Sequence, residues 1–133
     1  MTSQKTPRAP RVVVPRPERV RHPGPGGYGW LDARLHRQGW LELLTPEDVA
    51  VYTFLCLVAN RQGVSWYRRD RIRQALGIRQ DTLWQSLERL YSLDLVAYRP
   101  FGEHASDGFH QVLSLPPEGP PEVFPLLRDG NSS

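Results

Sequence analysis

The sequence predicts a mainly α, mixed α+β domain: three helices, a β-hairpin after them and one short extra helix in front. Three observations support this class. Apolar residues recur at helical spacing, the middle of the chain contains one strong helix start, and two strand-like runs flank a polar loop after the last helix. We therefore divide the 133 residues into an arm (1–29), a folded domain (30–115) and a tail (116–133).

The arm is rich in basic residues and proline. It holds six basic residues against one acid, six of the 13 prolines, and a Pro-Gly-Pro-Gly-Gly run just before Tyr28. Proline fixes φ and removes a hydrogen-bond donor, while glycine adds chain entropy, so we expect neither helix nor strand here. The arm is either a disordered leader or an additional grip on DNA phosphates or a minor groove. The Pro-rich tail is expected to be mostly extended.

The excess positive charge lies outside the folded domain. The chain has a net charge of +3, yet residues 30–115 contain ten arginines and ten carboxylates. Cys56 is the single cysteine, so there is no disulfide framework. The sequence contains neither an apolar run of about 20 residues nor an apolar signal segment. We therefore expect a cytoplasmic protein without a membrane segment, whose domain is not basic overall.

The central helix of the domain is predicted from its start. Leu31 and Leu35 share one face of a short preceding helix. Thr45 is then a good N-cap, and Pro46 suits the first helical position. Two acids follow that complement the helix dipole, and nearly every later position is apolar. We expect residues 46–60 to be the buried core helix.

A second helix is predicted over residues 68–77. With Ile72 facing inward, the helical period places Arg69 and Arg73 on one flank and Arg71 on the other. This helix therefore presents arginines on both sides.

The third helix is predicted over residues 80–92, where Leu83, Leu87 and Leu90 are spaced to face the core. Three tryptophans outside this helix are expected to anchor the core: Trp30, Trp40 and Trp66.

A β-hairpin is predicted after the third helix. Residues 95–98 enter a strand that Pro100 stops, residues 101–108 form a polar loop, and residues 109–115 return as a second strand. Another short strand is predicted at residues 64–66. Three helices closed by a hairpin are the parts of a winged helix-turn-helix.

Several local motifs between residues 44 and 101 occur together in one known family. They are Leu44-Thr45-Pro46, the run from Ala59 to Gly63 followed by Ser65-Trp66, Leu76-Gly77-Ile78, Thr82 before an apolar residue, and Leu-x-x-Leu-x-x-Leu-x-Leu-Val ending at Val96. On these motifs the segment resembles the winged helix-turn-helix family of plasmid replication initiators and related mobile-element proteins. The resemblance implies non-enzymatic, sequence-directed binding of double-stranded DNA in replication, transposition or transcription control. Residues 80–92 would be the recognition helix in the major groove.

The resemblance also implies which residues contact DNA. The helix before the recognition helix crosses the DNA backbone in this fold, so basic side chains there and in the turn would grip phosphates, with one more arginine at the base of the hairpin. Those phosphate-contacting residues are Arg68, Arg69, Arg71, Arg73, Arg79 and Arg99. Gln80, Gln85 and Arg89 would approach base edges. A homodimer fits palindromic DNA sites, and a protein partner in a replication or transposition complex fits as well.

Two features of the third helix depart from the family pattern. Arg79 stands where the family places Ser or Thr as N-cap. The outward face carries Asp81 and Glu88, which phosphates repel, beside Trp84. Trp84 either packs against the predicted hairpin or the N-terminal helix, or contacts a partner, since tryptophan is enriched at interface hot spots. These three residues support an alternative, a winged-helix module that binds a protein through its third helix.

Catalytic and metal chemistry find little support in the sequence. No nucleophile elbow, phosphate-binding glycine loop or paired acidic motif is present. Polar residues around the predicted hairpin loop fit no zinc pattern; they are Glu103, His104, Asp107 and His110. We therefore expect no enzymatic activity, no metal and no cofactor.

Overall fold

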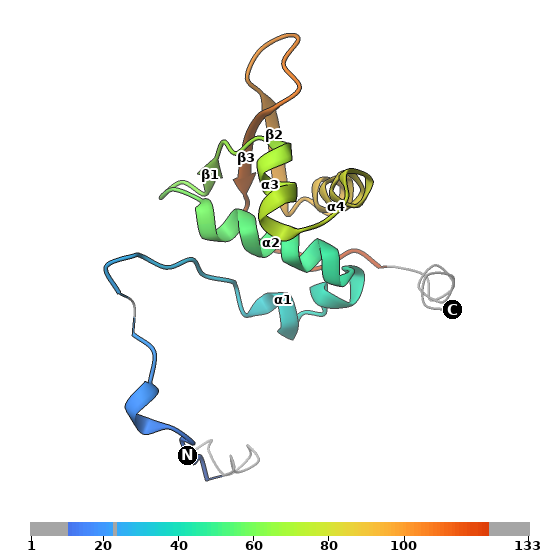
Figure 1. Ribbon diagram of the computed structural model, residues 1–133. Coiled ribbons are helices and arrows are strands. Elements are labelled where there is room, and N and C mark those ends of the chain that lie inside the picture. Colours follow the sequence, from blue (N-terminus) through green and yellow to red (C-terminus); the bar gives the residue numbers. More distant parts are fainter. Residues whose placement is uncertain (1–10, 23, 123–133) are drawn as a thin grey trace.

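The computed structural model describes residues 11–22 and 24–122, and within them the predicted α+β class is confirmed (Figure 1). Four α-helices and one three-stranded antiparallel sheet are present in this part of the chain. The helices are α1 (Arg34–Arg37), α2 (Pro46–Val58), α3 (Arg69–Leu76) and α4 (Gln80–Ser92), and the strands are β1 (Val64–Ser65), β2 (Val96–Pro100) and β3 (Gly108–Val112). Two 3-10 turns accompany them, η2 (Pro17–Arg19) and η3 (Trp40–Leu43).

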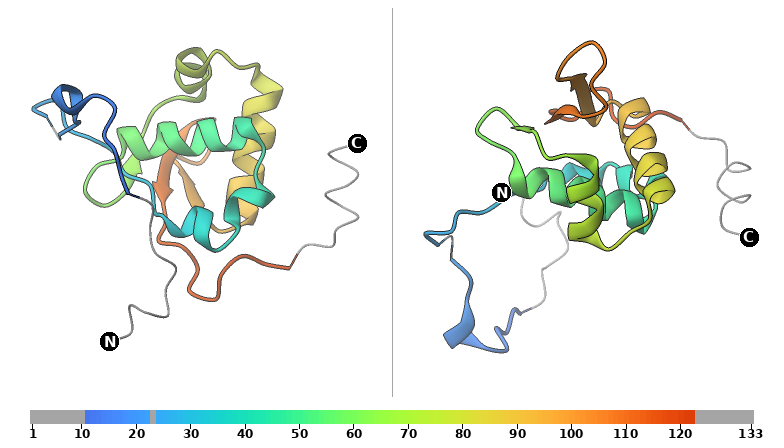
Figure 2. Two further views of the ribbon diagram at one scale, coloured as in Figure 1. Left: turned by 90° about the horizontal axis from the view of Figure 1, so that it is seen from below. Right: turned by 45° about the horizontal axis from the view of Figure 1, so that its top comes forward.

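The described part of the arm extends away from the end of the domain that carries the hairpin (Figures 1 and 2). It contains the turn η2, which starts with Pro17, and an isolated bridge between Gly24 and Gly27. The expectation of no regular structure is wrong at these two places. Both are local: Pro17 is accommodated at the start of a helical turn, where its missing N–H costs no hydrogen bond.

Helix α2 begins as its sequence predicts. The Thr45 hydroxyl accepts a hydrogen bond from the Asp48 backbone N–H at 3.1 Å, and the Asp48 carboxylate accepts one from the Thr45 N–H at 2.9 Å. This reciprocal capping box satisfies two backbone donors at the helix start. The helix ends at Val58, two residues before the predicted end at residue 60.

The core lies between α2 and α4, and α3 and the sheet pack against the same core. Its buried residues are Leu35, Trp40, Val51, Tyr52, Leu55, Ile72, Leu83, Leu87, Leu90, Leu95, Val96 and Leu115. The leucines of α4 face this core as their spacing predicts. Within the described residues, no helix combines the length and apolar character that crossing a membrane requires.

Only one of the three tryptophans predicted to anchor the core does so. Trp40 is fully buried in η3, whereas Trp30 and Trp66 are exposed. Trp30 precedes α1 and is 71% exposed. Trp66 follows the buried Ser65, and side chains alternate between the two faces of a strand. The prediction for Trp30 and Trp66 was therefore wrong.

The sheet has the order β1-β3-β2, and its two faces differ in burial. Ser65, His110 and Tyr98 are aligned across the three strands and face the helices. Residues on the other face, including Arg99 and Phe109, are exposed. The hairpin requires glycine at position 108, because a Cβ there would lie 2.1 Å from the Arg99 carbonyl oxygen.

Candidate nucleic-acid interface

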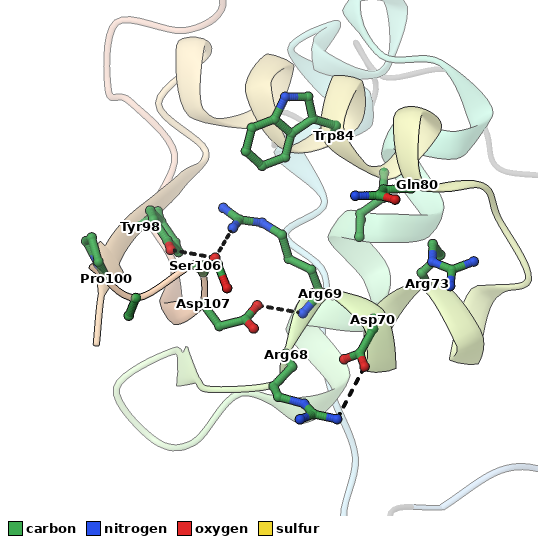
Figure 3. Close-up of a pocket in the computed structure, with 12 residues that line it drawn as sticks. Arg68, Arg69, Asp70, Arg73, Gln80, Trp84, Tyr98, Pro100, Ser106 and Asp107 are labelled. Carbon is green, nitrogen blue, oxygen red and sulfur yellow. Dashed lines mark hydrogen bonds and ion pairs between the residues drawn. The ribbon is translucent and has the colours of Figure 1, made fainter. Parts of the chain in front are cut away.

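A groove of about 620 Å³ lies between α3, the start of α4 and the β2–β3 hairpin (Figure 3). Arginines enter it from α3, Gln80 and Trp84 from α4, and Tyr98 from β2. The two helices and the hairpin that were predicted to form a DNA-binding surface therefore border the same groove.

Arg69 connects the three elements around the groove. Its guanidinium carbon lies 4.7 Å from the ring centroids of both Trp84 and Tyr98. The same guanidinium donates a hydrogen bond to the Ser106 carbonyl, and the Arg69 backbone N–H donates to the Asp107 carboxylate at 2.9 Å. Cation–π contacts of this kind stabilise by roughly 0.5–2 kcal/mol each. Together, the hydrogen bonds and cation–π contacts of Arg69 hold the β2–β3 hairpin against α3 and α4.

This placement changes the role predicted for Arg69 and for Trp84. Arg69 is half-buried and its guanidinium is engaged with the protein, so it does not stand free on the flank of α3 as predicted. Trp84 packs against Arg69 on one side while remaining half exposed. Packing within the domain and contact with a partner are therefore compatible for this tryptophan.

Behind Arg69 lies a buried aromatic stack. The His110 ring is 5.1 Å from Tyr98 and 6.0 Å from Tyr91, and its Nε2 is 2.8 Å from the Tyr91 hydroxyl. Burial, reinforced by the positive charge of Arg69, lowers the pKa of His110 to about 4. His110 is therefore neutral near pH 7 and supports Tyr98 rather than providing a cation.

Arg89 does not lie on the outward face of α4, contrary to the prediction. Its Nη1 donates to the Asp48 carboxylate of α2 at 2.8 Å. The Asp48 side chain is 0% exposed and that of Arg89 is 38% exposed. This ion pair joins the two central helices, and we remove Arg89 from the residues proposed to approach base edges.

The remaining arginines of the interface differ in their partners. Arg68 pairs with Asp70 at 3.2 Å and Arg79 with Asp81 at 2.6 Å, both at the surface. Arg79 has no side-chain capping bond at the start of α4, consistent with its departure from the usual N-cap types. In the described part of the chain, no ion pair is formed by Arg71, Arg73 or Arg99.

The outward face of α4 is less acidic than its residue types suggest. The Arg79 guanidinium beside Asp81 lowers the pKa of that carboxyl, so Asp81 stays ionised and its charge is locally balanced. Glu88 has no such partner among the described residues. Gln80 and Gln85 are exposed on this helix as predicted, and Gln80 also lines the groove.

The polar residues around the hairpin loop do not converge. His110 is buried against Tyr91, Asp107 accepts from the Arg69 backbone, and Glu103 and His104 are exposed. Across residues 11–22 and 24–122, no group of three or more His, Cys, Asp or Glu side chains is arranged to hold a metal ion.

Sequence reasoning missed the residues that organise this site. Asp48, Ser106 and Asp107 hold arginines that lie 37 to 41 positions away in the chain. No local spacing signals such pairs. The one usable hint was the number of arginines on α3, since a half-buried arginine needs partners.

No protein-family model matches the chain, and neither a curated protein nor a solved structure similar to it was found. The functional argument therefore depends on the geometry of the interface.

Proposed function

We propose that this chain is a non-enzymatic winged helix-turn-helix protein that binds double-stranded DNA. In this proposal α3 and α4 form the helix-turn-helix, α4 enters the major groove, and the β2–β3 hairpin is the wing. The resemblance of its motifs to plasmid and mobile-element proteins suggests a role in replication, transposition or transcription control.

One observation supports this proposal most strongly: arginines of α3 and of the turn before α4 border the groove at the start of α4. Arg68 and Arg73 line this groove and Arg79 lies at the adjoining start of α4, whereas Arg71 and Arg99 do not line it. Arg73 forms no ion pair in the described residues. Phosphate contacts contribute much of the affinity for DNA and position a protein on it. Gln80 and Gln85 are exposed on α4 and can pair with adenine edges.

The charge balance of this surface also favours a polyanion. Four arginines (Arg68, Arg69, Arg73 and Arg79) and three acids (Asp70, Asp81 and Asp107) line the groove and the adjoining start of α4, a local net charge of +1. Residues 30–115 taken together have no net charge, with ten arginines and ten carboxylates. The proposed interface is therefore slightly more positive than the domain as a whole.

The alternative is a protein partner on the same helix. Trp84 is half exposed and Glu88 is unpaired in the described residues, and a flat aromatic beside an acid suits a protein contact better than a phosphate. Because Asp81 is balanced by Arg79, less negative charge opposes DNA than the sequence alone suggests. DNA is therefore the preferred ligand.

Binding of the full chain to a fluorescent random-sequence duplex tests the proposal. We expect fluorescence anisotropy to report binding at about 50 mM salt that weakens steeply by about 200 mM. Arg73→Ala should reduce the slope of log K against log salt by about 1, whereas Arg37→Ala on α1 should leave it unchanged. Absence of binding at the low salt concentration, or equal slopes for the two variants, contradicts the proposal.

A further inference from the structure

The outer face of the sheet exposes aromatic side chains that the duplex interface does not use. Phe101 is 47% exposed and Phe109 is 40% exposed, and their rings contact each other edge to face with centroids 5.0 Å apart. Trp66, directly after β1, is 58% exposed. Side chains of this size are normally covered in a soluble domain, so their grouping requires an explanation.

The strand register places these residues on one surface. Phe109 is paired with Arg99 on the outer face of the sheet. The adjacent pair along these strands, His110 with Tyr98, is on the face toward the helices. Ser65 is aligned with His110 and shares its face of the sheet. Because successive side chains point to opposite faces, the side chain of Trp66, the next residue, lies on the same face as Phe109. We call Trp66, Arg99, Phe101 and Phe109 the aromatic face.

The strand positions of the aromatic face carry one arginine and no acid. Arg99 is exposed beside Phe109 and forms no ion pair in the described residues. The neighbouring strand positions on this face are Val64, Ala97 and Gln111, none of them acidic. The carboxylate nearest in sequence to Phe109, that of Asp107, is engaged with the Arg69 backbone N–H. Exposed rings next to an uncompensated arginine fit a ligand that combines flat bases with negative charge.

We infer that the aromatic face binds single-stranded nucleic acid, with bases stacked on Trp66, Phe101 or Phe109 and a phosphate near Arg99. Every base offers a π-face, so this contact needs no particular sequence. The site is on the opposite side of the sheet from the buried residues that contact α2 and α4, and is separate from the groove around Arg69. A strand displaced from a duplex is one source of such a ligand. Single-strand binding itself does not depend on the proposed duplex function.

The test uses the full chain and a fluorescent oligothymidine of about 15 nucleotides, a length within the range that single-strand-binding folds cover. Stacking on an aromatic side chain commonly changes affinity by about fivefold or more per base. We expect Trp66→Ala and Phe109→Ala each to weaken oligothymidine binding by about that factor. Phe109→Leu, which keeps apolar bulk but has no ring, should weaken it as well.

Controls separate stacking from general effects. Leu57→Ala removes an exposed apolar side chain from α2 and should leave oligothymidine affinity unchanged. Duplex affinity, measured in parallel, should be the same for Phe109→Leu and the unmodified chain. Loss of single-strand binding and loss of duplex binding are then detected separately. The inference is overturned if the unmodified chain does not bind oligothymidine, or if the ring substitutions leave its affinity unchanged. It is also overturned if Trp66→Ala only dissociates a dimer seen by sedimentation, because the face would then be a protein interface.

Discussion

Arg89→Ala is expected to lower the free energy of unfolding by about 3 kcal/mol, because it leaves a buried carboxylate without its cation. Asp48 is fully buried and accepts from Arg89 at 2.8 Å, and its second oxygen, Oδ1, has no hydrogen-bond partner within the described residues. Breaking a buried pair by removing one partner typically costs about 3–5 kcal/mol. The lower end applies because Arg89 itself is 38% exposed. Urea denaturation followed by circular dichroism measures the change.

Arg79→Ala provides the matched control on the same helix. The Arg79–Asp81 pair is shorter, at 2.6 Å, but its side chains are 81% and 57% exposed. Exposed pairs contribute roughly 0–1 kcal/mol, so we expect a change of about 0.5 kcal/mol or less. Similar small losses for both substitutions would show that Asp48 is reached by water when Arg89 is removed.

Combined replacement of Arg68, Arg73 and Arg79 by alanine is expected to weaken duplex binding by about 100-fold or more near 100 mM salt. Each lost phosphate contact removes about 0.9 from the slope of log K against log salt, so the slope should fall by nearly 3. Arg68 and Arg79 form only exposed ion pairs and Arg73 forms none in the described residues, so folding should be preserved. Anisotropy titrations at several salt concentrations give both quantities, and an unchanged slope would exclude these arginines as phosphate contacts.

Local sequence patterns were sufficient for the elements of the fold. The leucine spacing of α4 and the Thr45-Pro46 start of α2 depend on neighbours a few positions away, and the observed starts agree with them. The hairpin was predicted for the same reason, since alternation and a polar loop are local signals. These interactions act over one or two turns or across one loop, which is why sequence reasoning captured them.

The roles of individual side chains were harder to predict, because they depend on contacts between distant segments. Helical spacing predicts an outward-facing Arg89, and only the crossing of α2 with α4 brings Asp48 to it. The Arg69 guanidinium contacts Trp84, Tyr98 and the Ser106 carbonyl of the hairpin loop. Local sequence patterns do not reveal that these residues lie beside it. Trp66 shows the converse: its size favours burial, but strand alternation places it outside.

The most direct measurement of DNA binding by the domain compares two variants of equal charge in the full chain. One replaces the interface arginines Arg68, Arg73 and Arg79 by alanine, and the other replaces the arm arginines Arg11, Arg19 and Arg21. If the α3–α4–hairpin surface is the duplex interface, the first variant loses about 100-fold in affinity while the second loses much less. Equal losses, or a larger loss for the arm variant, would show that duplex binding is a property of the basic arm and not of the folded domain.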